Sequence, residues 1–208
     1  MRLILIRQGE SRHSLEGTVA GKKGCTGLTP RGYEQALALA DCLHQTGELR
    51  ECAALLSSPV LRARQTADVL AKVLSVGAVE EDCDLCEVHP GEADGLAWDV
   101  YRAKYGEWDL VASPDRPFSP GGEAWSQFLP RVEAALCRLA DRFEGRTVVA
   151  VSHAGFVVGS VLTLFAIPRP GTRARLDPVH TSLTEWERSD AIWRLIRYND
   201  CHHLADRP

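Results

Sequence analysis

The sequence predicts an α/β fold, a three-layer sandwich in which a mostly parallel central sheet is flanked by helices. The first observation is a set of short apolar runs, at residues 3–6, 53–57 and 147–151, each suited to a strand buried on both faces. The second is that helical patterns follow these runs, an alternation typical of parallel sheets. Two segments near the end, 183–187 and 191–198, are apolar or alternating, and we expect two closing strands joined by a turn.

The composition bounds the class of protein. The chain has 208 residues, of which 45% are hydrophobic, so it can bury a substantial core as one domain over residues 1–208. A formal net charge of −4 and the lack of a basic stripe argue against binding to nucleic acid by bulk electrostatics. The apolar opening is too short to span a bilayer and lacks the pattern of a signal peptide. We therefore expect a cytoplasmic protein with no membrane partner.

The cysteines predict reduced thiols. Seven cysteines, an odd number, are scattered through the chain, which does not suit a disulfide framework. Cys83 and Cys86 form a Cys-x-x-Cys pair, but no second pair and no nearby His-x-x-x-His segment accompanies them. We therefore predict buried apolar thiols and no metal site.

The first predicted strand ends in Arg7-Gln8-Gly9, and Glu10-Ser11 can begin a helix. This arrangement suits an anion, because the guanidinium offers a planar fork of donors and glycine lets the backbone approach a ligand. Residues 14–27 follow with closely spaced glycines, which predicts a loop. A helix over residues 30–46 comes next, with Thr29 as its N-cap and proline at its first position.

Arg62 repeats the relation that Arg7 has to its strand. It lies in the first turn of a helix predicted over residues 60–74, soon after the second apolar run. Because the carboxyl ends of parallel strands share one edge of a sheet, the two guanidinium groups can converge there. Two converging guanidinium groups favour a phosphate or sulfate ligand.

The segment 88–127 is predicted to be an insertion, or cap, over the sheet edge. It is rich in proline, glycine and aromatic residues and has one convincing helix, at about 96–105. Most of its aromatic residues are expected to pack in a small core. Trp98, Tyr101 and Trp125 are candidates for the wall of a pocket.

A histidine follows the third apolar run. After a helix predicted over residues 128–143 and the strand at 147–151, the chain continues as Ser152-His153-Ala154-Gly155 and enters an apolar helix over 156–165. A strand end that opens a helix N-terminus is a place where anions bind and where imidazole chemistry is often found.

Together these pieces resemble the histidine phosphatase superfamily, which includes the cofactor-dependent phosphoglycerate mutases and many small phosphatases. The resemblance implies a phosphoglycerate mutase-like fold. It rests on six blocks in the family's order: Arg7 with Gly9-Glu10-Ser11; Leu28-Thr29 with Gly32 and Gln35-Ala36; Ser57-Ser58-Pro59 with Arg62-Ala63 and Gln65-Thr66-Ala67; Glu87 with Gly91; Gly121-Gly122-Glu123; and Ser152-His153-Ala154-Gly155.

The resemblance implies a role for each matching residue. Arg7 and Arg62 would grip the phosphoryl oxygens, with Ser11 as a further donor. His153 would hold the phosphoryl group from the other side and stabilise developing charge, and Glu87 would protonate the leaving alkoxide. The ligand implied is a small-molecule phosphoester. No cofactor or metal is expected, because these side chains supply the positive charge.

The chain departs from the family at two positions. Gln8 stands where the family has its nucleophilic histidine, and an amide nitrogen, whose lone pair is delocalised, cannot attack phosphorus. His180 precedes Thr181-Ser182, where asparagine is more frequent.

Three explanations stay open. We rank first a phosphomonoester hydrolase of impaired or trapped chemistry, in which Gln8 is natural or an engineered replacement for histidine. The second is a non-catalytic phosphoester-binding module. The third is a repurposed enzyme in which His153, His180 or water performs another reaction. We prefer a hydrolase to a mutase because Arg102 and Arg116 in the insertion are not adjacent. The oligomeric state is not predicted, and a homodimer remains open.

Overall fold

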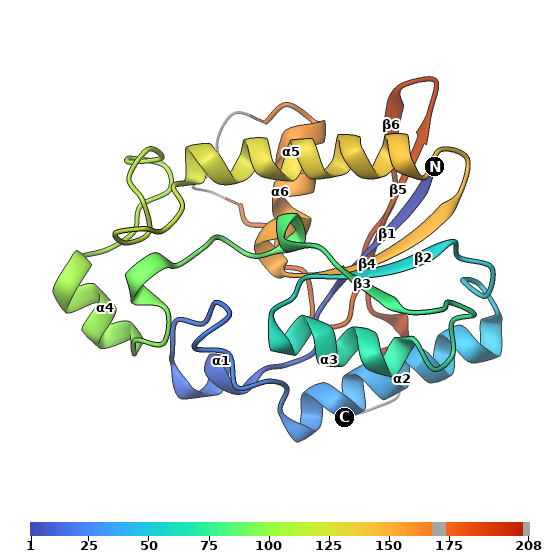
Figure 1. Ribbon diagram of the computed structural model, residues 1–208, viewed down its shortest axis with the longest axis horizontal. Coiled ribbons are helices and arrows are strands. Elements are labelled where there is room, and N and C mark those ends of the chain that lie inside the picture. The colour runs from blue at the N-terminus through green and yellow to red at the C-terminus, as the bar shows by residue number, and fades with distance from the viewer. Residues whose placement is uncertain (168–173, 206–208) are drawn as a thin grey trace.

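A six-stranded sheet in the order β3-β2-β4-β1-β5-β6 forms the centre of the computed structural model, which describes residues 1–167 and 174–205 (Figure 1). Strands β1 to β4 are parallel, β5 is antiparallel to β1, and β6 is antiparallel to β5. The predicted mostly parallel sheet is therefore confirmed. The strands are β1 (Arg2–Arg7), β2 (Ala54–Ser57), β3 (Val79–Glu81), β4 (Thr147–Ser152), β5 (Leu183–Ser189) and β6 (Ile192–Asp200).

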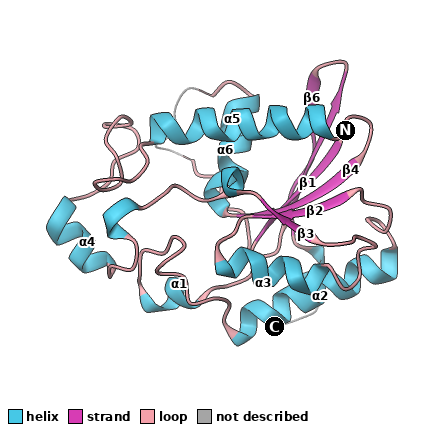
Figure 2. Cartoon of the chain, in the orientation of Figure 1, coloured by secondary structure: helices cyan, strands magenta, loops and turns pink. Residues whose placement is uncertain are grey.

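Helices cover both faces of the sheet, so the predicted three layers are also confirmed (Figure 2). Helices α2 and α3 pack on one face, and α5 and α6 pack on the other. The α-helices are α1 (Arg12–Glu16), α2 (Pro30–Thr46), α3 (Leu61–Leu70), α4 (Trp98–Tyr105), α5 (Trp125–Arg142) and α6 (Ala154–Leu164), and the short 3-10 helices are η1 (Cys83–Leu85), η2 (Gly91–Ala93) and η3 (His202–Leu204).

The first strand illustrates why its sequence is apolar without alternation. Leu3 and Leu5 pack into the core beneath α5 and α6, whereas Ile4 and Ile6 pack against α2 and α3. All four side chains are fully buried. A strand in the middle of a three-layer sandwich has no solvent face, and so it needs no polar positions.

Helix α2 has the ends that its sequence predicts. The Thr29 side chain accepts a hydrogen bond of 2.9 Å from the Gly32 N–H, and Pro30 occupies the first helical position. Gly47 ends the helix with a φ of 67°, the left-handed conformation that glycine adopts without steric cost.

Several predicted boundaries are corrected by the structure. Helix α3 ends at Leu70, four residues before the predicted end at 74. The segment 14–27 is not all loop, because its first residues belong to the short helix α1, which Gly17 ends with a φ of 63°. Helix α5 begins at Trp125, three residues before the predicted start at 128. The Gln127 side chain accepts a hydrogen bond of 2.9 Å from the Ala124 N–H, and this cap stabilises the additional turn.

The prediction of buried thiols at the Cys-x-x-Cys pair is half wrong. Cys86 is buried, but Cys83 is exposed. Cys83 is the first residue of η1, and a turn at the surface leaves its side chain in solvent.

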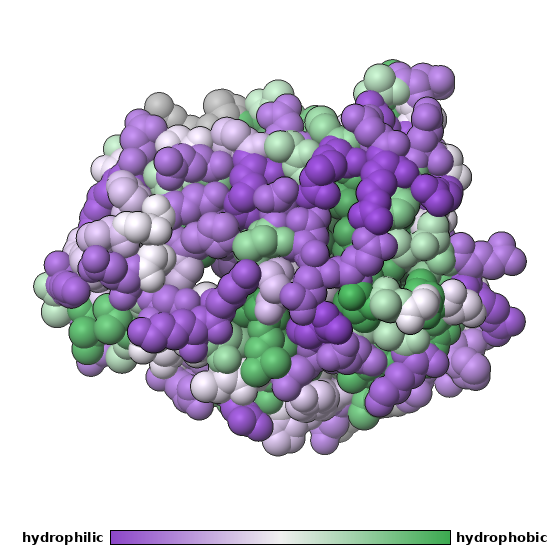
Figure 3. Space-filling model, in the orientation of Figure 1, coloured by the Kyte–Doolittle hydropathy of each residue, from purple (hydrophilic) through white to green (hydrophobic). Residues whose placement is uncertain are grey.

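The segment between β3 and α5 runs outside the sheet and includes α4, which lies apart from the strands in Figure 1. It has a small core of its own, in which Tyr101 and Phe118 stack with ring centroids 4.5 Å apart. On the face drawn in Figure 3 a hollow opens on the side of the molecule where α4 lies. Among the described residues, no helix is long and apolar enough to cross a membrane.

Candidate active site

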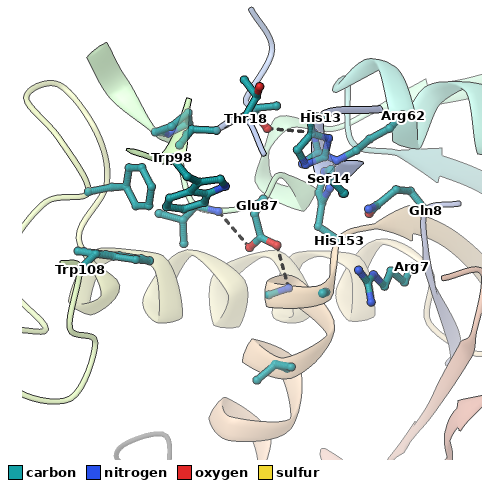
Figure 4. Close-up of a pocket in the computed structure, with 18 of the residues that line it drawn as sticks. Arg7, Gln8, His13, Ser14, Thr18, Arg62, Glu87, Trp98, Trp108 and His153 are labelled. Atoms are coloured by element: carbon teal, nitrogen blue, oxygen red, sulfur yellow. Dashed lines mark hydrogen bonds between the residues drawn. The ribbon is translucent and has the colours of Figure 1, made fainter. Parts of the chain in front are cut away.

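The carboxyl ends of the parallel strands deliver polar side chains to one cavity of about 600 Å³ (Figure 4). Arg7 ends β1 and Gln8 follows it, while His153 follows β4. Arg62 lies in the first turn of α3, after β2, and Glu87 follows β3 and η1. All five residues line the cavity. Ligands of open α/β sheets bind at this edge, so the fold itself gathers the predicted residues.

Strand pairing explains why Gln8 and His153 are neighbours. In the parallel ladder of β1 and β4, Arg7 is in register with Ser152. The Gln8 N–H donates to the Ser152 carbonyl over 2.9 Å, and so both chains leave the sheet side by side.

The two terminal nitrogens of Arg7 have partners, whereas its Nε has none among the described residues. Its Nη1 donates to the Pro178 carbonyl, and its Nη2 lies 3.0 Å from His180 Nε2. Its Nε is buried and has no hydrogen-bond partner among the described residues. Burial lowers the pKa of Arg7, but an arginine stays charged in proteins.

Arg62 and His153 show the same pattern. Arg62 Nη1 donates to the Ala20 carbonyl over 2.9 Å, and its Nε is buried without a partner in the described part of the chain. His153 Nε2 lies 2.8 Å from Ser58 Oγ, while its Nδ1 is buried and unpartnered. Buried polar atoms are rarely left unsatisfied, so these atoms indicate where a ligand's acceptor oxygens fit.

Glu87 is fixed at the N-terminus of α6. Its Oε2 accepts a hydrogen bond of 2.9 Å from the Gly155 N–H, and its Oε1 accepts one of 3.2 Å from the Val88 N–H. A β-carbon added at Gly155 would lie 1.9 Å from Glu87 Oε1. Glycine at this position is therefore what lets the carboxylate lie against the helix end.

Gln8 is buried, with 5% of its surface exposed. Its Oε1 has no hydrogen-bond partner among the described residues. The side chain faces the same cavity as Arg7 and Arg62 (Figure 4).

The electrostatics favour an anion. Burial lowers the pKa of His13 and of His180, and the charges of Arg62 and Arg7, respectively, add to this effect, so that both pKa values lie at about 4. Burial, and then the Arg62 charge, lowers the pKa of His153 well below its ordinary value. The imidazoles are therefore neutral at pH 7 in the free protein. An anion would relieve the repulsion and raise their pKa values.

The structure does not bring every predicted site residue to the cavity wall. Ser11 is fully buried, and its hydroxyl lies 2.8 Å from His13 Nδ1 and 3.1 Å from Ser14 Oγ. Ser11 thus contacts His13, which lines the cavity, but does not line it directly. His180 likewise contacts Arg7, which lines the cavity, but does not line the cavity itself. His13 was not predicted, because nothing in its local pattern distinguishes it from a surface residue of a short helix.

The other half of the cavity is apolar. Trp98 and Trp125 line it, and so does Trp108, which the sequence did not single out. The prediction that Tyr101 belongs to the wall is wrong: its side chain does not line the cavity, is 1% exposed and packs in the small core around α4. These aromatic rings therefore divide between wall and core.

Comparison with known proteins places the chain in a family. The model of the histidine phosphatase superfamily (branch 1) matches residues 3–201. The chain belongs to this superfamily. A metal-independent phosphoserine phosphatase of Arabidopsis thaliana is 28% identical over 98% of this chain and 83% of its own length.

Solved structures of the superfamily agree in fold. A phosphoserine phosphatase mutant from Entamoeba histolytica, in which a histidine is replaced by alanine, was solved in complex with phosphoserine; it has a TM-score of 0.76 and 26% identity, with 98% of both chains covered. Bacillus stearothermophilus YhfR has a TM-score of 0.82 at 24% identity, again with 98% of both chains covered. The second likeness shows the shared fold alone.

Proposed function

We propose that this protein is a phosphomonoester hydrolase of the histidine phosphatase type whose chemistry is impaired or trapped by Gln8. The observation that supports this best is the set of buried, unpartnered nitrogens of Arg7, Arg62 and His153 around one cavity. A phosphoryl group placed between them would satisfy all three, and preorganised donors of this kind supply the largest part of phosphoryl-transfer catalysis.

Each residue has a distinct role in this proposal. The two guanidinium groups bind the phosphoryl oxygens, and His153 Nδ1 donates to them once it is protonated. Glu87 gives a proton to the leaving alkoxide, and the Gly155 N–H fixes its position. Gln8 occupies the place of the nucleophile but cannot form the covalent intermediate. The remaining groups support slow hydrolysis by water.

The metal-free nature of this proposal has support in the chain itself. Positive charge comes from Arg7 and Arg62, and the Arabidopsis relative is named a metal-independent enzyme. The hydrolase is preferred to a mutase because Arg102 and Arg116 do not line the cavity. Arg116 instead donates to the Tyr105 and Glu107 carbonyls.

The substrate class follows from the wall opposite the arginines. Trp98, Trp108 and Phe118 line that side, and none of the described lining residues there is a lysine or arginine. A second acidic group, such as the carboxylate of phosphoserine, would lack a cation there. We therefore infer an aryl or otherwise apolar phosphomonoester of small size, whose ring packs on these side chains.

A binding module is the second candidate, and Gln8 is the observation that favours it. A cavity that keeps its donors but lacks a nucleophile binds a phosphoester without turning it over. The E. histolytica mutant is in complex with phosphoserine although one histidine is missing from it.

The test compares this chain with Gln8→His on a panel of aryl phosphates, phosphoserine and 3-phosphoglycerate. We expect phosphate release by the histidine form to be faster by about 10³-fold or more, with aryl phosphates preferred and a phosphohistidine species on rapid quench. Gln8→Ala is the matched control, because it too lacks a nucleophile, and it should show no gain. Equal inactivity of all three forms, together with tight phosphoester binding, would support the binding module and refute the hydrolase.

A further inference from the structure

Three side chains with metal-binding atoms meet beside the active-site cavity. Cys83 Sγ lies 3.6 Å from Cys86 Sγ and 4.0 Å from His89 Nε2, and the three donor atoms all lie within 4.8 Å of one another. They belong to a Cys-x-x-Cys-x-x-His segment, in which a single histidine follows the cysteine pair.

The local backbone explains why these side chains converge. Cys83–Leu85 is a 3-10 helix, in which residues three apart lie above one another. The Asp82 carboxylate caps it by accepting the Asp84 N–H over 3.0 Å. The Cys86 N–H donates to the Cys83 carbonyl over 3.1 Å, which closes the turn and aligns the two sulfurs.

Arg131 of α5 holds the turn in place. Its Nη1 donates to the Asp84 carbonyl over 2.7 Å and to the Cys86 carbonyl over 3.1 Å. Its Nη2 donates to the Glu87 carbonyl over 3.3 Å. The backbone that carries the two sulfurs is therefore ordered before any ligand arrives, which lowers the cost of ordering on binding.

His89 has a carboxylate behind it. Glu123 Oε2 lies 4.0 Å from His89 Nδ1 and accepts the His89 backbone N–H over 3.2 Å. Glu123 is itself buried and bound by Arg131. A carboxylate that faces the second nitrogen is the usual partner of a histidine that binds metal through the first, since it fixes the ring and its tautomer.

We propose that Cys83, Cys86 and His89 bind a zinc ion. Bonds of about 2.3 Å to sulfur and about 2.0 Å to nitrogen at tetrahedral angles separate two sulfurs by about 3.8 Å and sulfur from nitrogen by about 3.5 Å. The observed 3.6 and 4.0 Å match these separations after small side-chain rotations. Each thiol loses its proton to solvent as the ion binds. The fourth position faces a cavity of about 260 Å³ that the three residues line.

The site is distinct from the phosphate site and does not rest on the proposed function. None of its three ligands lines the larger cavity. The arrangement of two cysteines and one histidine with an open position suits zinc, whose thiolate and imidazole ligands differ from the oxygens that magnesium and calcium prefer.

The test uses tag-free full-length protein, reduced and freed of metal by a chelator. Zinc is titrated against a chromophoric chelator, and cobalt serves as a spectroscopic probe, because two thiolates give it an intense charge-transfer absorption. We expect one equivalent of either ion to bind. Cys83→Ser and His89→Gln should each weaken zinc binding by more than about 100-fold, since even the loss of an outer-shell partner costs about 10–100-fold.

Cys137→Ser is the matched control, because Cys137 is an exposed cysteine of α5 outside the cluster. It should bind zinc as the parent does, and thermal melting checks that each variant is folded. The proposal is wrong if the reduced parent gives no thiolate-to-cobalt absorption. It is equally wrong if Cys83→Ser and His89→Gln bind zinc as tightly as the parent.

Discussion

Replacement of Arg131 by methionine should destabilise the fold strongly. Its guanidinium donates to both carboxylate oxygens of Glu123, over 2.8 and 2.7 Å, and to three backbone carbonyls of the turn before Val88. The two side chains are 14% and 10% exposed. Removal of one partner leaves a buried charge uncompensated, which costs about 3–5 kcal/mol. In a chain of this size that lowers Tm by about 6–20 °C.

Calorimetry and urea unfolding measure this change directly. Arg138→Met is the matched control, since Arg138 lies on the same helix and pairs with Asp82 and Asp84 but is 43% exposed, and it should cost no more than about 1 kcal/mol. The double variant Arg131→Met with Glu123→Met should recover part of the loss, because no charge is left buried, while three backbone carbonyls and the His89 N–H still lack their partners. A loss below about 1 kcal/mol for Arg131→Met, or no recovery in the double variant, would refute the reasoning.

Further predictions concern pH and the cavity. Because folding lowers the pKa of His13 and His180 to about 4 from 6.5, the unfolded chain binds more protons in this window, and Tm should fall as pH drops from 6.5 to 4. Phosphate should reduce this fall in Tm. The prediction is wrong if His13→Gln and His180→Gln each leave the dependence of Tm on pH unchanged. In the Gln8→His background, Gly155→Ala should reduce phosphate release by about 10²–10⁴-fold by displacing Glu87, with Tm unchanged or raised. Trp98→Ala should raise KM for aryl phosphates but not for phosphoserine. An equal rise in KM for both substrates would show that the Trp98 ring does not recognise the aryl group.

The sequence predicts the position of a site residue well where that residue directly follows a buried strand. Arg7 and His153 could be placed because a buried apolar run has few alternatives to a parallel strand, and such strands end at one edge. His13 and Trp108 could not be placed, because their positions depend on the path of loops and of a five-residue helix with no usable period. The side chain of Cys83 turned outward for the same reason, since a 3-10 turn has no amphipathic pattern to read.

A single hydroxyl proton lies between the active-site cavity and the proposed zinc site. Ser58 Oγ lies 2.8 Å from His153 Nε2 and 3.4 Å from Cys86 Sγ, and it can donate to only one of them. When neutral His153 turns a protonated Nδ1 toward an anion, its Nε2 carries no proton and accepts a hydrogen bond from the Ser58 hydroxyl. Cys86 Sγ then loses this donor. By thermodynamic linkage, any state of Cys86 whose sulfur accepts the Ser58 hydrogen bond more strongly weakens anion binding. A bound anion disfavours that state of Cys86 by the same free energy.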